Sequence, residues 1–360
     1  MNRLVILTGG GTAGHVTPNL ALVEPLRAKG FEVAYMGREN GMERGLAEGA
    51  GLPYFPIAAG RLHRYFDPEN LINPFRNIKG MAQAVRILRR EKPCVVFAKG
   101  GFVSVPVVMA ARMAGIPVVL HECDYTPGLA NKLCIPFAKT ICTNFEETVA
   151  YLPKKKAVYT GTPIRAELSQ GSRFEGYRLT GFTENKPVLL VMGGSTGAGA
   201  LNEGVRAALD LLLERYQVLH LCGRGNREEA LERPGYFQLE YANQELPHLY
   251  AIADVMLSRA GANSLAEILM LKIPAILVPL PADESRGDQI LNAGAFEKRG
   301  YSYVLPQADI TPERLVQAVD TVQEHRRDYI TAMSGQYVKT GTEEVVRQIC
   351  LAAGDKGENE

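Results

Sequence analysis

The chain has 360 residues, which is enough for two domains that each bury a core of their own. Its composition, with 46% hydrophobic and 22% charged residues, is that of an ordinary globular protein. The formal net charge is only +1, so overall charge gives no reason to expect a nucleic acid as partner.

The cysteines and the N-terminus indicate where the protein works. None of the six cysteines forms a C-x-x-C pair or a zinc-ligand spacing, which favours buried thiols in a reducing cytoplasm. The first residues run straight into a strand-like segment, so no signal peptide is expected. The most apolar stretch, residues 94–120, is interrupted by Lys99 and Arg112 and does not predict a transmembrane helix.

Short apolar runs alternate with amphipathic helical patterns through the first half of the chain. The runs are mostly continuous rather than alternating in polarity, which is typical of a parallel sheet covered by helices on both faces. They predict strands at residues 4–8, 32–37, 54–59, 94–99, 117–122, 140–144 and 157–161.

The first predicted strand leads into a glycine-rich loop with G-x-G-x-x-G spacing that starts at Gly9. Such glycines let backbone N–H groups approach a phosphate or a sugar closely. We expect Thr17 and Pro18 to begin the next helix as N-cap and first residue, and the helix to end near Gly30.

His15 follows the last glycine of this loop directly. Beside a helix N-terminus an imidazole pKa is expected to fall, which would leave His15 neutral near pH 7 and able to accept a proton. The alternative is a histidine that only hydrogen-bonds the loop. An NADP-dependent oxidoreductase is a further alternative, because Arg38 at the end of the second strand would suit a 2′-phosphate; the acidic residue typical of NAD sites is missing there.

The pattern restarts after a polar, glycine-rich stretch at residues 160–187, which we expect to be a connector. A second glycine loop at 193–197 contains Ser195 and would suit a diphosphate at a helix start. A helix is expected over the tail, residues 340–353. The second set of strands is predicted at residues 187–194, 217–223, 237–242, 255–259, 275–280 and 302–306.

Two later segments carry candidate ligands. Ser264 and Glu267 form the S-x-x-E pattern of a helix capping box; alternatively, the Glu267 carboxylate bonds a ribose diol, and the sequence leaves both open. In the acidic segment 279–300, Gln289 or Asp288 is expected to bond sugar hydroxyls. No D-x-D follows a strand, so a metal-bridged diphosphate is not expected.

Together and in this order, five segments resemble the MurG family of GT-B glycosyltransferases. They are GGGTAGHVTPNLAL, KGGFVSVPVVMAARMAGIPVVLHE, GTPIR, GGSTGAGALN and SRAGANSLAEI. The resemblance implies transfer of N-acetylglucosamine from UDP-GlcNAc to undecaprenyl-pyrophosphoryl-MurNAc-pentapeptide, with inversion and no required metal. It also implies an α/β fold of two doubly wound Rossmann-like domains facing across a cleft: residues 1–163 on the acceptor and membrane side, and 164–339 for UDP-GlcNAc, with the 340–353 helix packing back on the first.

The resemblance also assigns roles by position. It implies that the first glycine loop faces the donor sugar, that His15 is the catalytic base, and that Asp124 or Glu122 is the second choice for that role. Asp124 stands where the family commonly has an amide. The implied substrate-binding residues are Gly11, Thr12 and Ala13 in the loop, Arg165 and Ser195 for the donor, Ala242 for uracil, Glu267 for ribose and Gln289 for the sugar hydroxyls.

A lipid-linked acceptor implies contact with a membrane, and segment 61–92 would supply it. It carries eight Lys and Arg residues against three acids, with Leu71, Ile72, Phe75 and Ile78 interleaved. We therefore expect a peripheral protein on the cytoplasmic face of an anionic membrane; the alternative is a helix with a solvated basic face. Other functions that these loops would serve are a UDP-GlcNAc 2-epimerase, a glycolipid glycosyltransferase and a non-catalytic nucleotide-sugar sensor.

Overall fold

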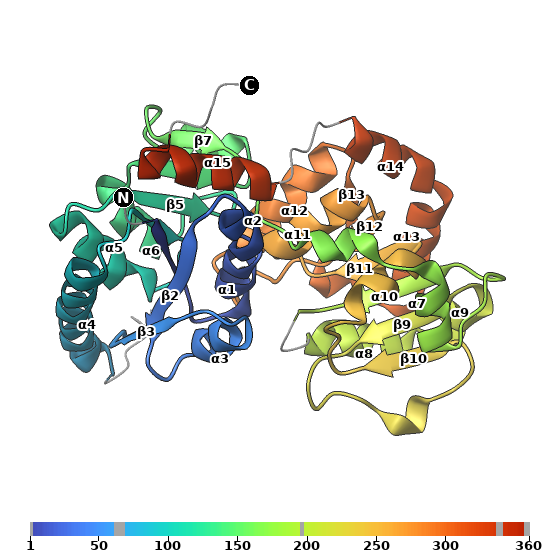
Figure 1. Ribbon diagram of the computed structural model, residues 1–360. Coiled ribbons are helices and arrows are strands. Elements are labelled where there is room, and N and C mark those ends of the chain that lie inside the picture. The colour runs from blue at the N-terminus through green and yellow to red at the C-terminus, as the bar shows by residue number, and fades with distance from the viewer. Residues whose placement is uncertain (1–2, 61–68, 195–197, 336–340, 356–360) are drawn as a thin grey trace. The chain divides into compact units, whose positions relative to one another are not determined.

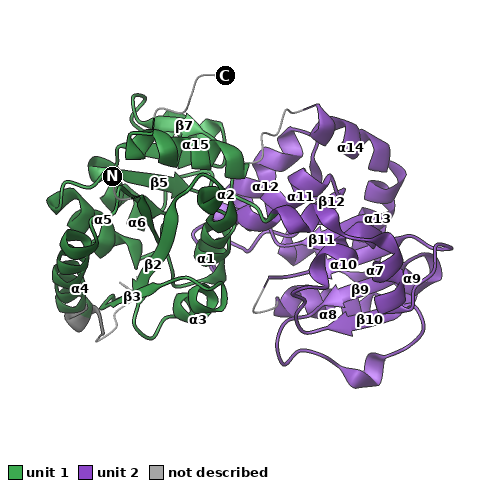
Figure 2. Ribbon diagram, viewed as in Figure 1, with its two compact units in different colours: residues 1–165, 339–360 green, residues 166–338 purple. Residues whose placement is uncertain are grey.

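The computed structural model describes residues 3–60, 69–194, 198–335 and 341–355 (Figure 1). The chain divides into two compact units (Figure 2). Unit 1 comprises residues 1–165 and 339–360, and unit 2 comprises residues 166–338. Each unit contains one parallel sheet, as the continuous apolar runs predict.

The sheet of unit 1 has seven parallel strands in the order β3-β2-β1-β4-β5-β6-β7. The order reverses between β1 and β4, so the loops that follow these two neighbouring strands lie at the same edge of the sheet. The strands are β1 (Leu4–Thr8), β2 (Glu32–Arg38), β3 (Tyr54–Ile57), β4 (Val95–Ala98), β5 (Val118–Glu122), β6 (Thr140–Thr143) and β7 (Ala157–Tyr159).

Helices cover both faces of this sheet, and β1 shows how the sequence produces two core layers. Ile6 faces a cluster with α4 and α5 residues such as Leu88 and Val107, whereas Leu7 faces one with α2 and α15 residues such as Leu26. The helices are α1 (Ala13–Leu20), α2 (Val23–Ala28), α3 (Met42–Gly49), α4 (Glu69–Glu91), α5 (Ser104–Met113), α6 (Leu129–Cys134) and α15 (Gly341–Ala353), with short 3₁₀ turns at Ile135–Phe137 and Glu147–Tyr151.

The last helix, α15, belongs to unit 1 although it follows unit 2 in the sequence (Figure 1). Val345 and Ile349 are fully buried and pack in the same cluster as β1 and α2. At its start, the Thr342 hydroxyl donates to the carbonyl of Ile164 and accepts from its N–H, both at 3.0 Å. These hydrogen bonds join the two chain segments that make up unit 1.

Unit 2 repeats the design with six parallel strands in the order β10-β9-β8-β11-β12-β13, and its order reverses between β8 and β11. Its strands are β8 (Val188–Met192), β9 (Gln217–Leu221), β10 (Tyr236–Leu239), β11 (Val255–Ser258), β12 (Ala275–Leu277) and β13 (Ser302–Val304). Its helices are α7 (Arg173–Thr180), α8 (Gly199–Ala207), α9 (Leu209–Arg215), α10 (Leu246–Ile252), α11 (Ala262–Leu271), α12 (Asp288–Lys298), α13 (Pro312–Glu324) and α14 (Arg326–Ser334), with 3₁₀ turns at Ala166–Gln170, Glu229–Leu231 and Gln307–Asp309.

The predicted start of the first helix was wrong. The helix after the first glycine loop begins at Ala13, with Thr12 as N-cap, rather than at Pro18. Pro18 lies inside α1 and has no N–H to donate, and the helix ends two residues later, at Leu20. The expected connector, residues 160–187, includes the division between the two units and also contains a helix, α7, whose N-cap Ser172 accepts from the Glu175 N–H.

Candidate active site

The first glycine loop lies between β1 and α1 at the carboxyl edge of the unit 1 sheet. Gly11 and Thr12 are exposed and Ala13 is half-buried, so the stretch expected to face the donor sugar is at the surface. His15 lies within the first turn of α1, rather than before the helix as the sequence suggested, and its side chain is half-buried.

The loop that follows β4 contacts His15. Gly101 has φ +79°, and a Cβ there would lie 3.1 Å from His15 Cδ2 and 2.3 Å from the carbonyl oxygen of Gly10. Only glycine fits this close approach. The two loops at the topological switch point therefore pack directly on each other, with the His15 ring at their contact.

Glu122 ends β5 as a buried carboxylate that holds the next turn. Oε1 accepts from the Asp124 N–H at 3.0 Å, and Oε2 accepts from the Gly128 N–H at 3.0 Å and from Asn131 Nδ2 at 2.8 Å. Burial, followed by the Asp124 charge, raises the pKa of Glu122. Because both of its oxygens are bonded to the turn, Glu122 supports Asp124, which is half-buried.

Glu122, Cys123 and Asp124 place three potential metal-ligand atoms within 4.8 Å of one another. The hydrogen bonds of Glu122 to the turn account for this grouping, since they draw residues 122–128 together. Both Glu122 oxygens are engaged in these hydrogen bonds, so the position of the carboxylate is explained without an ion.

A buried pair behind this edge was missed in the sequence. Lys99 Nζ lies 2.8 Å from His121 Nδ1, and His121 Nε2 lies 2.8 Å from the carbonyl oxygen of Gly161. Since the carbonyl can only accept, Nε2 carries the proton and Nδ1 accepts from Lys99. Burial lowers the pKa of both groups, and Lys99 lowers that of His121 further. The pair thereby fixes the GTPIR segment to the sheet.

Arg165 closes that segment and is the last residue of the first part of unit 1. Its Nε is buried without a hydrogen-bond partner among the described residues. A buried guanidinium nitrogen of this kind is available to an anion. Its predicted role in donor binding remains a prediction.

In unit 2, a cavity of about 590 Å³ lies at the carboxyl edge of the sheet, where the strand order reverses. The loops after β8, β11, β12 and β13 all contribute to it. Its lining comprises Gly193, Gly194, Ala198, Gly199, Ala200, Arg259, Gly261, Ser264, Leu280, Glu284, Gln289 and Gln307. Helix α8 begins at Gly199 in this lining, so backbone N–H groups of a helix start border the cavity.

Arg259 is a cavity residue that the sequence did not single out. It follows β11, is 7% exposed, and its Nη1 donates to the carbonyl of Val278 at 3.1 Å, while its Nε is buried and unbonded within the described chain. Burial lowers its pKa, and the Glu284 charge opposes that shift. A desolvated cation beside a helix start suits a diphosphate.

Gln289 and Glu267 are held differently. Gln289 lines the cavity, and its Oε1 accepts from the Leu280 N–H at 3.1 Å. Glu267 lies on α11 one turn after the lining residue Ser264 and accepts from the Tyr250 hydroxyl at 2.6 Å. The capping-box expectation was wrong: α11 begins at Ala262 with Gly261 as N-cap, so Ser264 is already inside the helix.

Two further residues, Ala242 and Ser195, were also predicted to bind the donor. Ala242 is buried and follows the edge strand β10. Ser195 lies outside the described residues.

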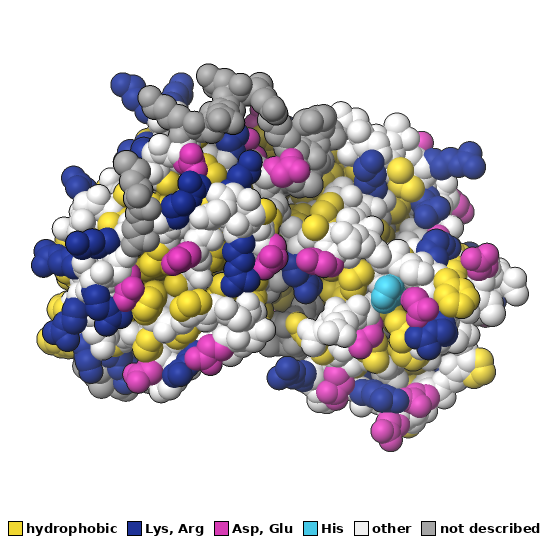
Figure 3. All heavy atoms as spheres, in the orientation of Figure 1, with side chains coloured by type: hydrophobic (Ala, Val, Ile, Leu, Met, Phe, Trp, Pro, Cys, Tyr) yellow, Lys and Arg dark blue, Asp and Glu magenta, His cyan; other side chains and the backbone are white. Residues whose placement is uncertain are grey.

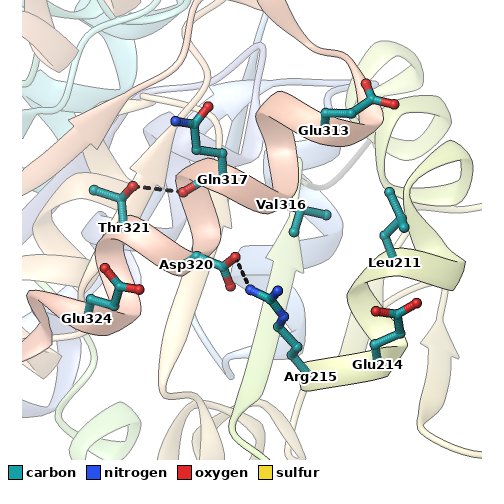
Figure 4. Close-up of a pocket in the computed structure, with 9 residues that line it drawn as sticks. All are labelled: Leu211, Glu214, Arg215, Glu313, Val316, Gln317, Asp320, Thr321 and Glu324. Carbon is teal, nitrogen blue, oxygen red and sulfur yellow. Dashed lines mark hydrogen bonds and ion pairs between the residues drawn. The ribbon is translucent and has the colours of Figure 1, made fainter.

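A second cavity of unit 2, of about 510 Å³, lies between α9 and α13 rather than at strand ends (Figure 4). Its wall carries the carboxylates Glu214, Glu313 and Glu324 and an ion pair between Arg215 and Asp320 at 2.5 Å. No glycine is among the residues that line it, and Glu313 already occupies the first turn of α13 there, so this mostly acidic wall does not suit a diphosphate.

The two sheets with their glycine loops are matched by known proteins. Residues 5–143 match the glycosyltransferase family 28 N-terminal domain, and residues 188–349 match the glycosyltransferase family 28 C-terminal domain. The chain belongs to glycosyltransferase family 28. Its predicted two-domain α/β fold, GT-B, and its classification as a glycosyltransferase are confirmed.

Relatives in family 28 are about 50% identical to this chain over nearly its whole length. A protein of Lachnoclostridium phytofermentans is 51% identical over 96% of this chain and 97% of its own length, and one of Clostridium kluyveri is 51% identical over 96% and 99%. Both are named UDP-N-acetylglucosamine--N-acetylmuramyl-(pentapeptide) pyrophosphoryl-undecaprenol N-acetylglucosamine transferase. This identity places the chain in that family of transferases within family 28.

Solved structures agree. The crystal structure of MurG from Acinetobacter baumannii matches 96% of this chain and 99% of its own with a TM-score of 0.75 and 28% identity. The kitacinnamycin glycosyltransferase matches 97% and 98% with a TM-score of 0.74, but at 17% identity it is alike in fold alone.

Proposed function

We propose that this protein transfers N-acetylglucosamine from UDP-GlcNAc to the MurNAc hydroxyl of undecaprenyl-pyrophosphoryl-MurNAc-pentapeptide, a step of peptidoglycan synthesis. The observation that carries the proposal is 51% identity over 96% of the chain to a transferase named for that reaction. Two features support it: the cavity of unit 2 where the strand order reverses, and His15 of unit 1, whose ring contacts the loop after β4.

Unit 2 holds the donor in this proposal. The start of α8 and the Arg259 guanidinium bind the diphosphate, because both offer N–H donors and the guanidinium is buried. Gln289 bonds sugar hydroxyls from the cavity wall. Glu267, held by Tyr250, bonds the ribose diol, and backbone at Ala242 reads uracil.

Unit 1 supplies the base. His15 removes the proton of the acceptor hydroxyl as its oxygen attacks the anomeric carbon from the face opposite UDP, so a single displacement inverts the configuration. Asp124 is the second candidate for this role. Glu122 acts through the turn that it holds and not on the substrate, since both of its oxygens are bonded. The leaving UDP is stabilised by backbone N–H groups and arginine, with no metal required.

We also propose that α4 of unit 1 contacts an anionic membrane surface. Phe75 and Ile78 are 73% and 60% exposed and lie one turn apart. The exposed basic residues of the helix are Arg76, Lys79, Arg86, Arg89 and Arg90. Dark blue side chains gather over this part of unit 1 in Figure 3. This combination suits a peripheral contact at the cytoplasmic face of the membrane, where the protein would bind the lipid-linked acceptor.

The predicted membrane segment extends beyond what is described. Residues 61–68 lie outside the described chain, as do the side chains of Leu71 and Ile72. In the described part of the protein, no helix has the length and apolarity needed to cross a bilayer.

The test is a transfer assay with UDP-GlcNAc and a lipid-linked MurNAc-pentapeptide in vesicles. We expect GlcNAc to appear on the lipid in β configuration, as read by NMR of the anomeric proton. Release of N-acetylmannosamine without an acceptor would instead identify an epimerase. Stabilisation by NADPH but not by UDP in thermal unfolding would identify an oxidoreductase.

A further inference from the structure

Glu43 is a buried carboxylate that the proposed reaction does not use. It is 1% exposed and lies in the first turn of α3, where the helix dipole favours a negative charge. Its Oε1 accepts from the Arg38 N–H, at the end of β2, at 3.0 Å. Burying a carboxylate with few hydrogen bonds is unfavourable, which makes its surroundings informative.

Three glycines make room for this carboxylate. A Cβ on Gly10 would lie 2.6 Å from Glu43 Cδ and within 2.9 Å of both carboxylate oxygens. A Cβ on Gly41 would lie 2.3 Å from Oε1, and one on Gly37 would lie 2.8 Å from Cγ. The Glu43 side chain therefore occupies the space that side chains at all three positions would need, and it packs directly on the backbone of the first glycine loop.

The other side of Gly10 is held by the loop that contacts His15. The Gly10 carbonyl oxygen lies 2.3 Å from the Cβ position of Gly101, which in turn lies 3.1 Å from the His15 ring. The residue before Gly10 is also fixed, because the Tyr35 hydroxyl donates to the Gly9 carbonyl at 2.7 Å. Gly10 is thus packed between Glu43 and Gly101, and Gly101 also lies against the His15 ring.

We propose that Glu43 is a positioning residue for glycosyl transfer: by filling the space over Gly10, it fixes the first glycine loop so that His15 meets the acceptor hydroxyl. Glu43 itself touches no substrate. The inference rests on the proposed role of His15. It requires the shape of the side chain and its acceptor for the Arg38 N–H, both of which glutamine retains.

The first test compares Glu43→Ala, Glu43→Gln and Glu48→Ala. Glu48 is the matched control because it lies on the same helix, is exposed, and loses only an ion pair with Arg44. We expect Glu43→Ala to lower kcat about 10- to 100-fold, whereas KM for UDP-GlcNAc changes less than about twofold because the donor cavity belongs to unit 2. Glu43→Gln should stay within about threefold of the wild type.

A double-mutant cycle tests the contact itself. Gly10→Ala should lower kcat strongly in the wild type, but Gly10→Ala combined with Glu43→Ala should be more active than Gly10→Ala alone, because the space is then free. Additive losses would overturn the inference, as would a kcat of Glu43→Ala equal to that of the wild type or a parallel rise in KM for UDP-GlcNAc.

A readout without turnover separates this inference from the proposed function. The imidazole NMR signals of His15, assigned with His15→Ala, should shift in Glu43→Ala and not in Glu48→Ala. Unshifted signals would overturn the positioning role even in an active enzyme. A His15→Ala variant with full activity would overturn the proposed base while leaving the expected NMR shift intact.

Discussion

The Tyr250 hydroxyl donates a 2.6 Å hydrogen bond to Glu267 Oε2, which fixes a carboxylate one helix turn beyond the cavity residue Ser264. If this carboxylate binds the ribose diol, its loss removes a hydrogen bond to a charged acceptor, which contributes about 1.5–3 kcal/mol. Glu267→Ala should therefore raise Kd for UDP about 10- to 100-fold in calorimetry.

Tyr250→Phe should weaken UDP binding less than Glu267→Ala, since it leaves the carboxylate in place. Glu229→Ala is the control, because Glu229 is an exposed glutamate of unit 2 that does not line the cavity. An unchanged Kd in Glu267→Ala would remove Glu267 from the site.

Arg259 should distinguish a diphosphate from a bare nucleoside. Arg259→Met removes the buried guanidinium, so we expect UDP to bind about 10- to 100-fold more weakly, whereas binding of uridine should stay the same. The ratio of the two dissociation constants, measured by calorimetry, is the readout. Equal weakening of uridine would point to a general loss of structure at the cavity.

His15→Ala should lower kcat about 10²- to 10⁴-fold if His15 is the base, with little change in the dissociation constant of UDP. Asp124→Asn provides the comparison, since an amide cannot take a proton. If Asp124→Asn shows the larger loss of kcat and His15→Ala remains active, the base is Asp124.

Acid should destabilise the protein through two buried, neutral histidines. Burial lowers the pKa of His121 well below its ordinary value and that of His220 to about 3. Unfolding restores the pKa of each to about 6.5, so only the unfolded chain takes up these protons below that pH. The stabilisation is complete above about pH 6.5 and is lost as pH falls toward the folded values, at about 1.4 kcal/mol per pH unit for each histidine.

Urea unfolding between pH 7.5 and 5 measures this slope. In His220→Gln the slope of unfolding free energy against pH should be shallower by about 1.4 kcal/mol per pH unit, the contribution of one histidine. His325→Gln alters an exposed side chain and should leave the slope as it is. A slope equal in wild type and His220→Gln would contradict the prediction.

Membrane binding should depend on the exposed face of α4. Phe75→Ser with Ile78→Ser should reduce flotation with vesicles that contain anionic phospholipid, because both apolar side chains are more than half exposed. Activity toward a water-soluble acceptor should be unchanged. Equal flotation with neutral and anionic vesicles in the wild type would argue against an electrostatic contribution from the basic residues.

The strands were predictable because parallel strands buried on both faces appear as continuous apolar runs, and every predicted run overlaps a strand of the structure. Helix starts were less predictable. Thr17-Pro18 and Ser264-x-x-Glu267 both have the residue types of a helix start, but the helices begin earlier, at Ala13 and Ala262. Thr12 and Thr17 are the same residue type, and Pro18 favoured the second, whereas Gly261 gives a weaker N-cap signal than Ser264.

The residues missed by the sequence are those whose partners lie far along the chain. The contact of Lys99 with His121 depends on β4 and β5 being neighbours, and that of Glu43 with Gly10 on how α3 packs beside the first loop. Arg259 is a single arginine after a strand, and nothing in the sequence separates it from other arginines. Only the structure shows that it is buried where four loops line one cavity.

The return of α15 to unit 1 has a consequence for how the protein is made. The side chains that complete one face of the first sheet, Val345 and Ile349 among them, leave the ribosome after all of unit 2. Until then, apolar residues of β1 and α2 lack part of their cover. The core of unit 1, whose first segment is translated before unit 2, can therefore be completed only after unit 2 has been translated.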